Sequence, residues 1–566
     1  MFLSGLPMNS KLNLIDGIII LFFCIIVLMR FEGIPDQYAA MFNFFNAPNS
    51  FPTDIYMNNT FFFDSSIYFS INNYLKLDQN DLTGLVWYFA VALIGACFLF
   101  LIIRDHFHVR DRSTILLIIL CVGFLGRDIP VNTWGGVIPI QPGTATMFAK
   151  TMGIIVVYFL LKNRFWIASF IMTAIFSIHI LGDFILFPVF VFFLYFNKDR
   201  KIRDIFSLTI PIAFLVLKAA ASSNILLPSD DGDILFDAVV TYARQDADFL
   251  YQSKLALVLL GTSFVIFPLY LRRCNEITPE LKNILWAIFI ASLLLVIAST
   301  FYTAFGQDYF KVTTFYMLAP VRALNYYTLF FYLVSFVWII NNNNLSPIEK
   351  ACLLVGLILL HGEGIKGILF PLIVIAGGFS TRILRPLFSL DTRKFNFQYI
   401  GVFMLAIVTA IQIFRGGVYN LHFDSLGWKY LNQWTVDIHA SPEVWHSYSL
   451  LRNHKDDFPL LPVYLNNRGI PSMSSYLNII GQKSFFITDG FHFYFNSNLW
   501  KEHLIRREAT DKMLNAFRHG TPLQAKLIND LKARKVGIMV PKELANNFPA
   551  SFSRKVFGTY ELIFMN

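Results

Sequence analysis

The chain has 566 residues, of which 55% are hydrophobic, 17% aromatic and only 15% charged, and its mean hydropathy is +0.54. In soluble domains roughly a quarter of the residues are charged. This composition therefore excludes a soluble enzyme, a disordered chain and a disulfide scaffold. The formal charge of +9 would suit a nucleic-acid-binding protein only if its placement along the chain were ignored. We therefore predict an α-helical polytopic membrane protein.

Apolar runs follow one another along most of the chain. A helix that crosses a hydrocarbon core about 30 Å thick needs ~20 apolar residues, and about 13 runs approach that length. Two of them flank the polar turn His361–Lys366, so they form either two spans or one re-entrant hairpin. The predicted spans are 13–29, 85–103, 114–126, 146–161, 165–180, 182–196, 205–222, 255–271, 283–302, 324–340, 351–361, 367–380 and 399–416.

Lysine and arginine gather in alternate connecting segments, for example at Arg110–Arg112, Lys198–Arg203 and Arg272–Arg273. Because short cytoplasmic loops carry an excess of these residues, the alternation predicts a cytoplasmic N-terminus and an extracytoplasmic C-terminus. Residues 1–417 then form the transmembrane domain, which includes a long first outside loop, 30–84. The excess of lysine and arginine therefore indicates the orientation of the chain in the membrane. It predicts membrane lipid as a partner and gives no support to a nucleic-acid site.

The tail, 418–566, carries more charges than the rest of the chain and alternates short apolar runs with turn residues. This pattern predicts a small extracytoplasmic α/β domain. The tail has no cysteine, so we expect it to fold without disulfides. The predicted elements are strands within 455–464 and 484–488, helices at 499–518 and 522–534, a strand at 535–540 and a last strand at 556–564.

The first outside loop opens with Asp36, directly after the first predicted span. One interpretation is an interfacial loop in which acids are incidental among aromatic belt residues. The other is a general base or a metal ligand that the chain holds at the boundary between lipid and water. Both interpretations remain open at this point.

Five further polar residues interrupt apolar sequence or lie at its outside edge. Arg127 and Asp128 are adjacent, so they either form a local ion pair or bind substrate. His179 and Asp183 have the i, i+4 spacing of one helical face, and they either cap a short hairpin or form a functional site. Arg322 begins a long apolar run, where it either reaches the membrane surface or binds a ligand.

The first 200 or so residues resemble the multi-span glycosyltransferases of the GT-C superfamily. The resemblance is closest in Ile34-Pro-Asp36-Gln-Tyr38, and the segments Gly126–Pro130 and Gln141–Ala145 stand where that superfamily often has further functional polar residues. The chain departs from the superfamily in one respect, because Gln37 replaces the second acid of the usual acidic pair. The resemblance implies that Asp36 activates the acceptor and that the donor is a sugar on a polyprenyl phosphate.

The chemistry of such a transfer gives the remaining residues a role. Attack at an anomeric carbon needs a carboxylate to take the acceptor proton and cations to stabilise the leaving phosphate. Asp36 is the candidate for the first role, and Arg127, Arg244 and Arg322 are candidates for the second. Lys150, within a predicted span, either pairs with an acid or contacts phosphate. We predict a membrane glycosyltransferase on the outer face of a bacterial inner membrane, with a glycan or lipid acceptor.

Two other functions remain open. The first is a transporter or flippase for a lipid-linked or polar solute, which would show two similar halves with broken helices. The second is a non-catalytic scaffold in the assembly of an envelope polysaccharide. The sequence has neither a Walker A motif nor a dinucleotide-binding fingerprint, and it leaves open whether a divalent metal ion takes part.

Overall fold

The computed structural model describes residues 14–29, 74, 81–107, 109, 112–123, 145–178, 183–198, 200–222, 236, 240, 248–273, 277–311, 315–316, 318, 320–360, 366–388, 446–448, 450–454, 457–463, 483–484, 486 and 497–564. The chain divides into two compact units. The helical unit comprises Met1–Phe31, Val86–Leu227 and Val240–Leu426. The tail unit comprises Glu32–Leu85, Pro228–Val239 and Gly427–Asn566.

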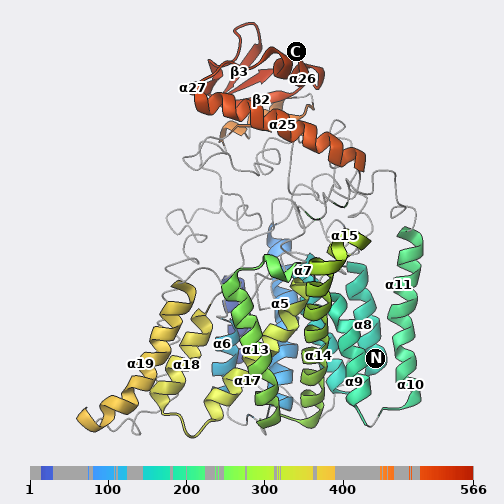
Figure 1. The fold of residues 1–566 in the computed structure, drawn as a ribbon, viewed down its shortest axis with the longest axis vertical. Helices are drawn as coiled ribbons and strands as arrows, with labels where there is room; N and C mark the ends of the chain where they lie inside the picture. The colour runs from blue at the N-terminus through green and yellow to red at the C-terminus, as the bar shows by residue number, and fades with distance from the viewer. Residues whose placement is uncertain are drawn as a thin grey trace. The chain divides into compact units, whose positions relative to one another are not determined.

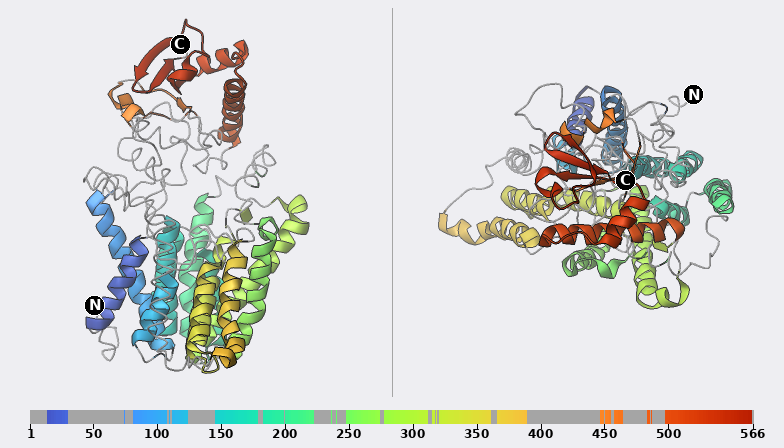
Figure 2. Two further views of the ribbon diagram at one scale, coloured as in Figure 1. Left: turned by 90° about the vertical axis from the view of Figure 1, so that its left-hand side faces the viewer. Right: turned by 90° about the horizontal axis from the view of Figure 1, so that it is seen from above.

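The helical unit is a bundle of helices that run side by side (Figure 1, Figure 2). A described helix occupies each predicted span except 399–416, which lies outside the described residues. The elements are α1 (Leu14–Met29), α5 (Asp81–His106), α6 (Arg112–Gly123), α7 (Ala145–Leu161), α8 (Phe165–Ile178), η4 (Asp183–Ile185), α9 (Leu186–Phe196), α10 (Ile202–Ile205), η5 (Phe206–Leu208), α11 (Thr209–Ser222), η6 (Phe249–Tyr251), α13 (Lys254–Arg273), α14 (Pro279–Phe301), η7 (Tyr302–Gly306), α15 (Gln307–Phe310), η8 (Arg322–Leu324), α17 (Asn325–Asn341), α18 (Pro347–Leu359) and α19 (Lys366–Phe388).

Within the described residues, four helices are long and apolar enough to cross a membrane. They are Phe89–His106, Lys254–Arg273, Pro279–Gly306 and Arg322–Asn341. Shorter apolar helices cover Phe148–Leu161, Phe165–Ile178, Asp183–Phe196 and Leu369–Ser380. The mostly helical, membrane-compatible character of the chain is therefore confirmed. The count of about 13 spans and the orientation of the chain stay predictions.

Helix ends in this unit follow from local sequence. Thr278 is the N-cap of α14, where its hydroxyl accepts a hydrogen bond from the Leu281 backbone N–H, and Pro279 occupies the first helical position. Ser346 and Glu349 form a reciprocal capping box at the start of α18. Such caps satisfy backbone N–H groups that a helix leaves without partners, so they define where these two helices begin.

Helix α17 is the central helix of the unit. It contacts α6, α13, α14 and α18, and 89% of the span Arg322–Asn341 is buried, against 28% of the span Lys254–Arg273. A helix that is apolar on all sides and enclosed by other helices has little contact with lipid. A polar side chain on α17 therefore has to be satisfied by other parts of the protein or by a ligand.

Helices α18 and α19 pack closely along each other, which is compatible both with two spans and with a re-entrant hairpin. The approach is close at Gly378, where an added Cβ would lie 2.6 Å from Cys352 Cβ, and at Gly356, where it would lie 2.5 Å from Ile375 Cγ1. Small residues let helix backbones approach in this way within a membrane protein. Residues 361–365, the polar part of the turn, lie outside the described residues.

The tail unit contains a four-stranded sheet of strand order β1-β2-β4-β3. β1 (Leu460–Pro462) pairs in parallel with β2 (Gly537–Pro541), whereas β4 (Tyr560–Phe564) pairs antiparallel with both β2 and β3 (Ser553–Phe557). The predicted strands near 460 and 535–540 are confirmed. The predicted single strand at 556–564 is wrong, because Gly558, with φ of +60°, turns the chain between β3 and β4.

Both faces of this sheet are covered by apolar side chains. Alternate strand residues point to opposite faces, so Ile538 and Ile563 join one buried cluster while Met539 and Leu562 join the other. The first cluster includes residues of α25 (Ser497–His519) and α26 (Ala525–Ala533), which confirm the two predicted helices. Ser484 and Phe486 exchange backbone hydrogen bonds with Leu460, and the short helix α27 (Lys542–Ala545) follows β2.

Candidate functional site

The structure describes two of the seven predicted site residues, Asp183 and Arg322, and both lie in the helical unit. The predicted base, Asp36, and the predicted substrate-binding residues Arg127, Asp128, His179 and Arg244 lie outside the described residues, so their roles stay predictions.

Asp183 begins the short helix η4 and is fully buried. One of its carboxyl oxygens, Oδ1, accepts a hydrogen bond of 2.8 Å from the Tyr326 hydroxyl on α17. A buried carboxyl group is tolerated only when other groups satisfy it, and Tyr326 supplies one such contact from a distant part of the chain.

Arg322 begins η8, the 3-10 turn that leads directly into α17. The turn is held by hydrogen bonds from the backbone N–H of Ala323 to the carbonyl of Pro320 and from that of Leu324 to the carbonyl of Val321. Helices η4 and η8 contact each other. The fold therefore brings together the elements that carry the two described candidates, as a shared site requires.

Two residues beside Asp183 were missed by the sequence interpretation, Gly153 and Tyr326. A Cβ atom added at Gly153 of α7 would overlap the Tyr326 hydroxyl, so only glycine lets this tyrosine lie against α7. Lys150 precedes Gly153 by about one helical turn and is fully buried. Gly153 gives no signal in the sequence, because a glycine among apolar residues is common in membrane helices.

Asn325 is the first residue of α17 and is also fully buried. Its backbone N–H donates to the carbonyl of Arg322. In the part of the chain that the structure describes, neither the amide nitrogen nor the amide oxygen of its side chain has a hydrogen-bonding partner. We use the name Asp183 cluster for six residues that lie on η4, on α7 and η8, which both contact η4, and on the start of α17: Lys150, Gly153, Asp183, Arg322, Asn325 and Tyr326.

The Asp183 cluster combines two cationic side chains, a carboxyl group, a phenol and an amide within apolar helices. Cationic side chains in such surroundings attract a phosphate or another anion, and the amide offers both a donor and an acceptor to a polar ligand. In membrane proteins, ionisable residues at this kind of position are functional candidates by default. The cluster is therefore the candidate functional site of the described residues.

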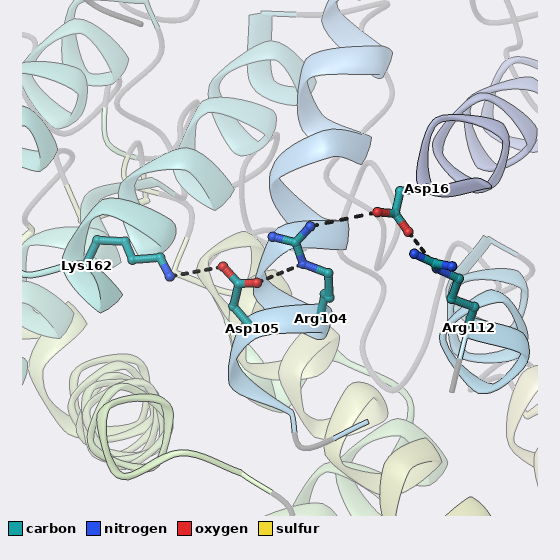
Figure 3. A network of polar contacts seen from close by, with 5 residues as sticks. All are labelled: Asp16, Arg104, Asp105, Arg112 and Lys162. Carbon is teal, nitrogen blue, oxygen red and sulfur yellow. Dashed lines mark hydrogen bonds and ion pairs between the residues drawn. The ribbon is translucent and has the colours of Figure 1, made fainter. Parts of the chain in front are cut away.

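A second polar group joins the helix ends where α5 and α7 finish and α1 and α6 begin (Figure 3). Asp16 accepts from Arg112 at 3.2 Å and lies 4.0 Å from Arg104. Asp105 accepts from Arg104 at 2.9 Å and from Lys162 at 3.0 Å. We refer to these five residues as the ion-pair network. Each of its charges has an opposite charge beside it, so the network ties four helices together.

The ion-pair network lies at the end of the helical unit where most of its described lysines and arginines are found. In Figure 1 this is the lower end, at which α5, α7, α9 and α13 finish and α14 and α18 begin. We call it the basic end. Its basic residues include Arg164, Arg200, Arg203, Arg272, Arg273, Lys282 and Lys350. The Asp183 cluster lies toward the opposite end, where α7, α9 and α17 begin.

Helix α14 changes its hydrogen-bonding pattern at that opposite end. A π-helix, η7, follows its last α-helical turn and leads into the short helix α15. Gln307 of α15 accepts a hydrogen bond of 2.5 Å from the Tyr316 hydroxyl. Single π-helical turns inside α-helices are found frequently at functional sites.

Among the described residues, no three His, Cys, Asp or Glu side chains lie close enough together to hold a metal ion. Comparison with models of known protein families and with curated protein sequences finds no match for this chain. The chemistry of the Asp183 cluster and the placement of its charges therefore carry the functional argument.

Proposed function

We propose that this chain is a membrane glycosyltransferase that uses a sugar linked to a polyprenyl phosphate. The observation that carries the proposal is that η4 and η8, the elements of Asp183 and Arg322, contact each other, and that η4 also contacts α7, the helix of the buried Lys150. A donor of this class has an apolar tail that lipid accepts and a phosphate that needs cations. The cluster supplies cations inside a helical bundle that is itself apolar.

In the proposed reaction, Asp36 takes the proton from the acceptor hydroxyl, whose oxygen attacks the anomeric carbon of the donor. The bond between that carbon and the phosphate oxygen breaks, and polyprenyl phosphate leaves with both electrons. Arg322 and Lys150 stabilise the charge on the leaving phosphate. The hydrogen bond between Tyr326 and Asp183 holds η4 beside α17 and so positions Arg322.

We propose that the reaction takes place on the outer face of a bacterial inner membrane, with the N-terminus in the cytoplasm and the tail unit outside. The crowding of lysine and arginine at the basic end supports this orientation, because such residues mark the cytoplasmic side of membrane proteins. The Asp183 cluster lies toward the opposite end of the helices, where an outer-leaflet donor would meet it.

The direct test replaces Asp36 with asparagine and measures transfer of labelled sugar from a polyprenyl phosphate to glycan or lipid in membrane vesicles. We expect product formation to fall by a factor of roughly 10²–10⁴ while the protein accumulates normally. The matched control is Asp78→Asn in the same outside loop, which should leave the rate near that of the wild type. Unchanged transfer by Asp36→Asn would overturn the assignment of the base.

A transporter or flippase for a lipid-linked solute is the second candidate, and the π-helical break in α14 favours it. The two candidates differ in what happens to a labelled polyprenyl-phosphate sugar in proteoliposomes. A transferase cleaves the sugar from the lipid in the presence of an acceptor. A flippase moves the intact molecule between leaflets and leaves the glycosidic bond in place.

A further inference from the structure

Asn325 stands apart from the other buried polar side chains around it. Its side chain is fully buried, and it lies on the most enclosed of the four described helices that are long enough to cross a membrane. Within the described part of the chain, both polar atoms of its amide lack a hydrogen-bonding partner. An unsatisfied buried amide destabilises the protein without a ligand. Because two polar atoms of one side chain are affected here, next to charged residues, they favour a bound state in which a ligand satisfies both of them.

The position of Asn325 indicates where that second partner would come from. Arg322 precedes Asn325 by three residues, and η8 is a 3-10 helix, in which side chains three residues apart share one face. Tyr326, the next residue, contacts Asp183. Asn325 therefore lies on the same face of this turn as Arg322, the residue that would hold the donor phosphate.

The chemistry of the amide narrows the class of ligand group. A planar amide presents an N–H donor and a carbonyl acceptor side by side, so it pairs well with two neighbouring hydroxyl groups, one of which donates while the other accepts. A hexose attached to the phosphate carries such hydroxyls close to the anomeric carbon. A phosphate alone offers acceptors only and would leave the amide oxygen without a donor.

We propose that Asn325 is a specificity-determining residue that binds neighbouring hydroxyl groups of the donor sugar while Arg322 binds the phosphate of the same molecule. This inference rests on the proposed function and adds to it the group that tells a sugar-loaded polyprenyl phosphate from an empty one. The donor then leaves the cluster once its sugar has been transferred, because the remaining polyprenyl phosphate has lost the contacts with Asn325.

The test uses the full-length purified protein in detergent and two probes, decaprenyl phosphate and decaprenyl phosphate linked to glucose, mannose or galactose in turn. The variant is Asn325→Leu, which has nearly the shape of asparagine but no polar atoms. Without a ligand, we expect its thermal unfolding midpoint to rise by about 2 °C, because a buried unsatisfied group has been removed. A structural role for Asn325 predicts a fall instead.

With the probes, the wild type should bind at least one sugar-linked lipid roughly tenfold or more tightly than decaprenyl phosphate. Asn325→Leu should lose that preference and keep the affinity for decaprenyl phosphate. Ser292→Ala is the matched control, since Ser292 of α14 is also fully buried and its hydroxyl has no partner in the described chain. That variant should keep the wild-type preference. If Asn325→Leu does not accumulate, Asn325→Ala takes its place.

The possible failures are distinguishable. If neither probe binds the wild type, the proposed function fails, and this inference fails with it. If both bind the wild type equally, or if Asn325→Leu keeps the preference for the sugar-linked lipid, the function stands and the role of Asn325 is overturned. Equal loss of both probes by the variant, together with a lower unfolding midpoint, would show a structural role and would also overturn the inference.

Discussion

The two polar regions of the helical unit differ in how far their neutral polar atoms are satisfied. In the ion-pair network, every charged side chain has an opposite charge within 4.0 Å, and the side chains of Asp105 and Lys162 keep 18% and 27% of their surface exposed. In the Asp183 cluster, the acid accepts a hydrogen bond from the Tyr326 hydroxyl, and both polar atoms of the neighbouring Asn325 amide lack a hydrogen-bonding partner among the described residues. The network pairs each charge with an opposite one, although Nη2 of Arg104 is buried without a hydrogen-bonding partner among the described residues. The cluster differs in that both polar atoms of the Asn325 amide lack such a partner.

This difference separates a structural polar group from a candidate site. The network contains the buried Asp16, but each of its charges has an opposite charge within 4.0 Å, so its ion pairs account for the burial without a ligand. A polar cluster within apolar helices that contains an unsatisfied amide is less stable than an apolar core of the same shape. Proteins retain unsatisfied polar groups in an apolar core mainly where function requires them.

The largest expected effect on stability comes from adding a side chain at Gly153, where α7 and Tyr326 of the Asp183 cluster approach each other. Gly153→Ala would place a methyl group where the Tyr326 hydroxyl now lies. We expect the free energy of unfolding to fall by about 3 kcal/mol, because overpacking in a helical core forces neighbouring side chains out of place. The measurement is thermal unfolding in detergent, together with sugar transfer, which should fall as Tyr326 moves away from Asp183.

Gly377→Ala and Gly261→Ala are the controls for this prediction. Neither glycine has any atom within 4 Å of an added Cβ, so both variants should be neutral or slightly more stable, since alanine favours a helix over glycine. If Gly153→Ala unfolds at the same temperature as these controls, the close approach of Tyr326 to α7 is wrong.

The second prediction breaks the ion-pair network. Asp105→Asn removes the charge that both Arg104 and Lys162 contact. We expect the free energy of unfolding to fall by about 2 kcal/mol, because Lys162 loses the acid beside it and Arg104 keeps only Asp16, at 4.0 Å. Transfer per folded molecule should stay near the wild-type value, in contrast to Gly153→Ala.

The exchange Asp105→Lys with Lys162→Asp is the control for that interpretation. It restores one opposite-charge pair at the same positions but places a second cation beside Arg104, so we expect partial recovery of the unfolding midpoint. A double-mutant cycle in which the single changes simply add would contradict a direct contact between Asp105 and Lys162.

The elements of the helical unit could be predicted from the sequence because helix formation in apolar runs is a local property. The same holds for α25, α26 and β2 of the tail unit, whose patterns and turn residues are local too. The turn at Gly558 was missed, because the apolar sequence from Val556 to Phe564 reads as one continuous strand. The positive φ of Gly558 divides this segment into two strands, β3 and β4.

The candidate site could be predicted only in part. Asp183 and Arg322 were found because each interrupts apolar sequence, and that signal is local. Their meeting through η4 and η8 depends on which helices pack together, which no pattern in one sequence encodes. Asn325 and Tyr326 were missed because polar residues at the start of a span usually lie at the membrane surface, and only the structure shows that they are buried.

The smallest expected effect compares two neighbouring tyrosines of α17. Tyr326 donates to the Asp183 carboxyl group at 2.8 Å, and Tyr327 makes a hydrogen bond of 3.0 Å with the Ser263 hydroxyl. Tyr326→Phe should lower the free energy of unfolding by about 1–2 kcal/mol, and Tyr327→Phe by about 0.5–1 kcal/mol. The difference arises because the Ser263 hydroxyl loses less than the buried Asp183 carboxyl group when the tyrosine O–H donor is removed.

The two phenylalanine variants should separate far more clearly in function than in stability. Tyr327 lies outside the Asp183 cluster, so Tyr327→Phe should transfer sugar at the wild-type rate. Tyr326→Phe releases η4 from α17, so Arg322 is no longer positioned against the donor phosphate, and the transfer rate should fall at least tenfold. Equal rates for the two variants would mean that the contact between Asp183 and Tyr326 is structural in the same sense as the ion-pair network. The Asp183 cluster would then differ from the ion-pair network only in how deeply its residues are buried.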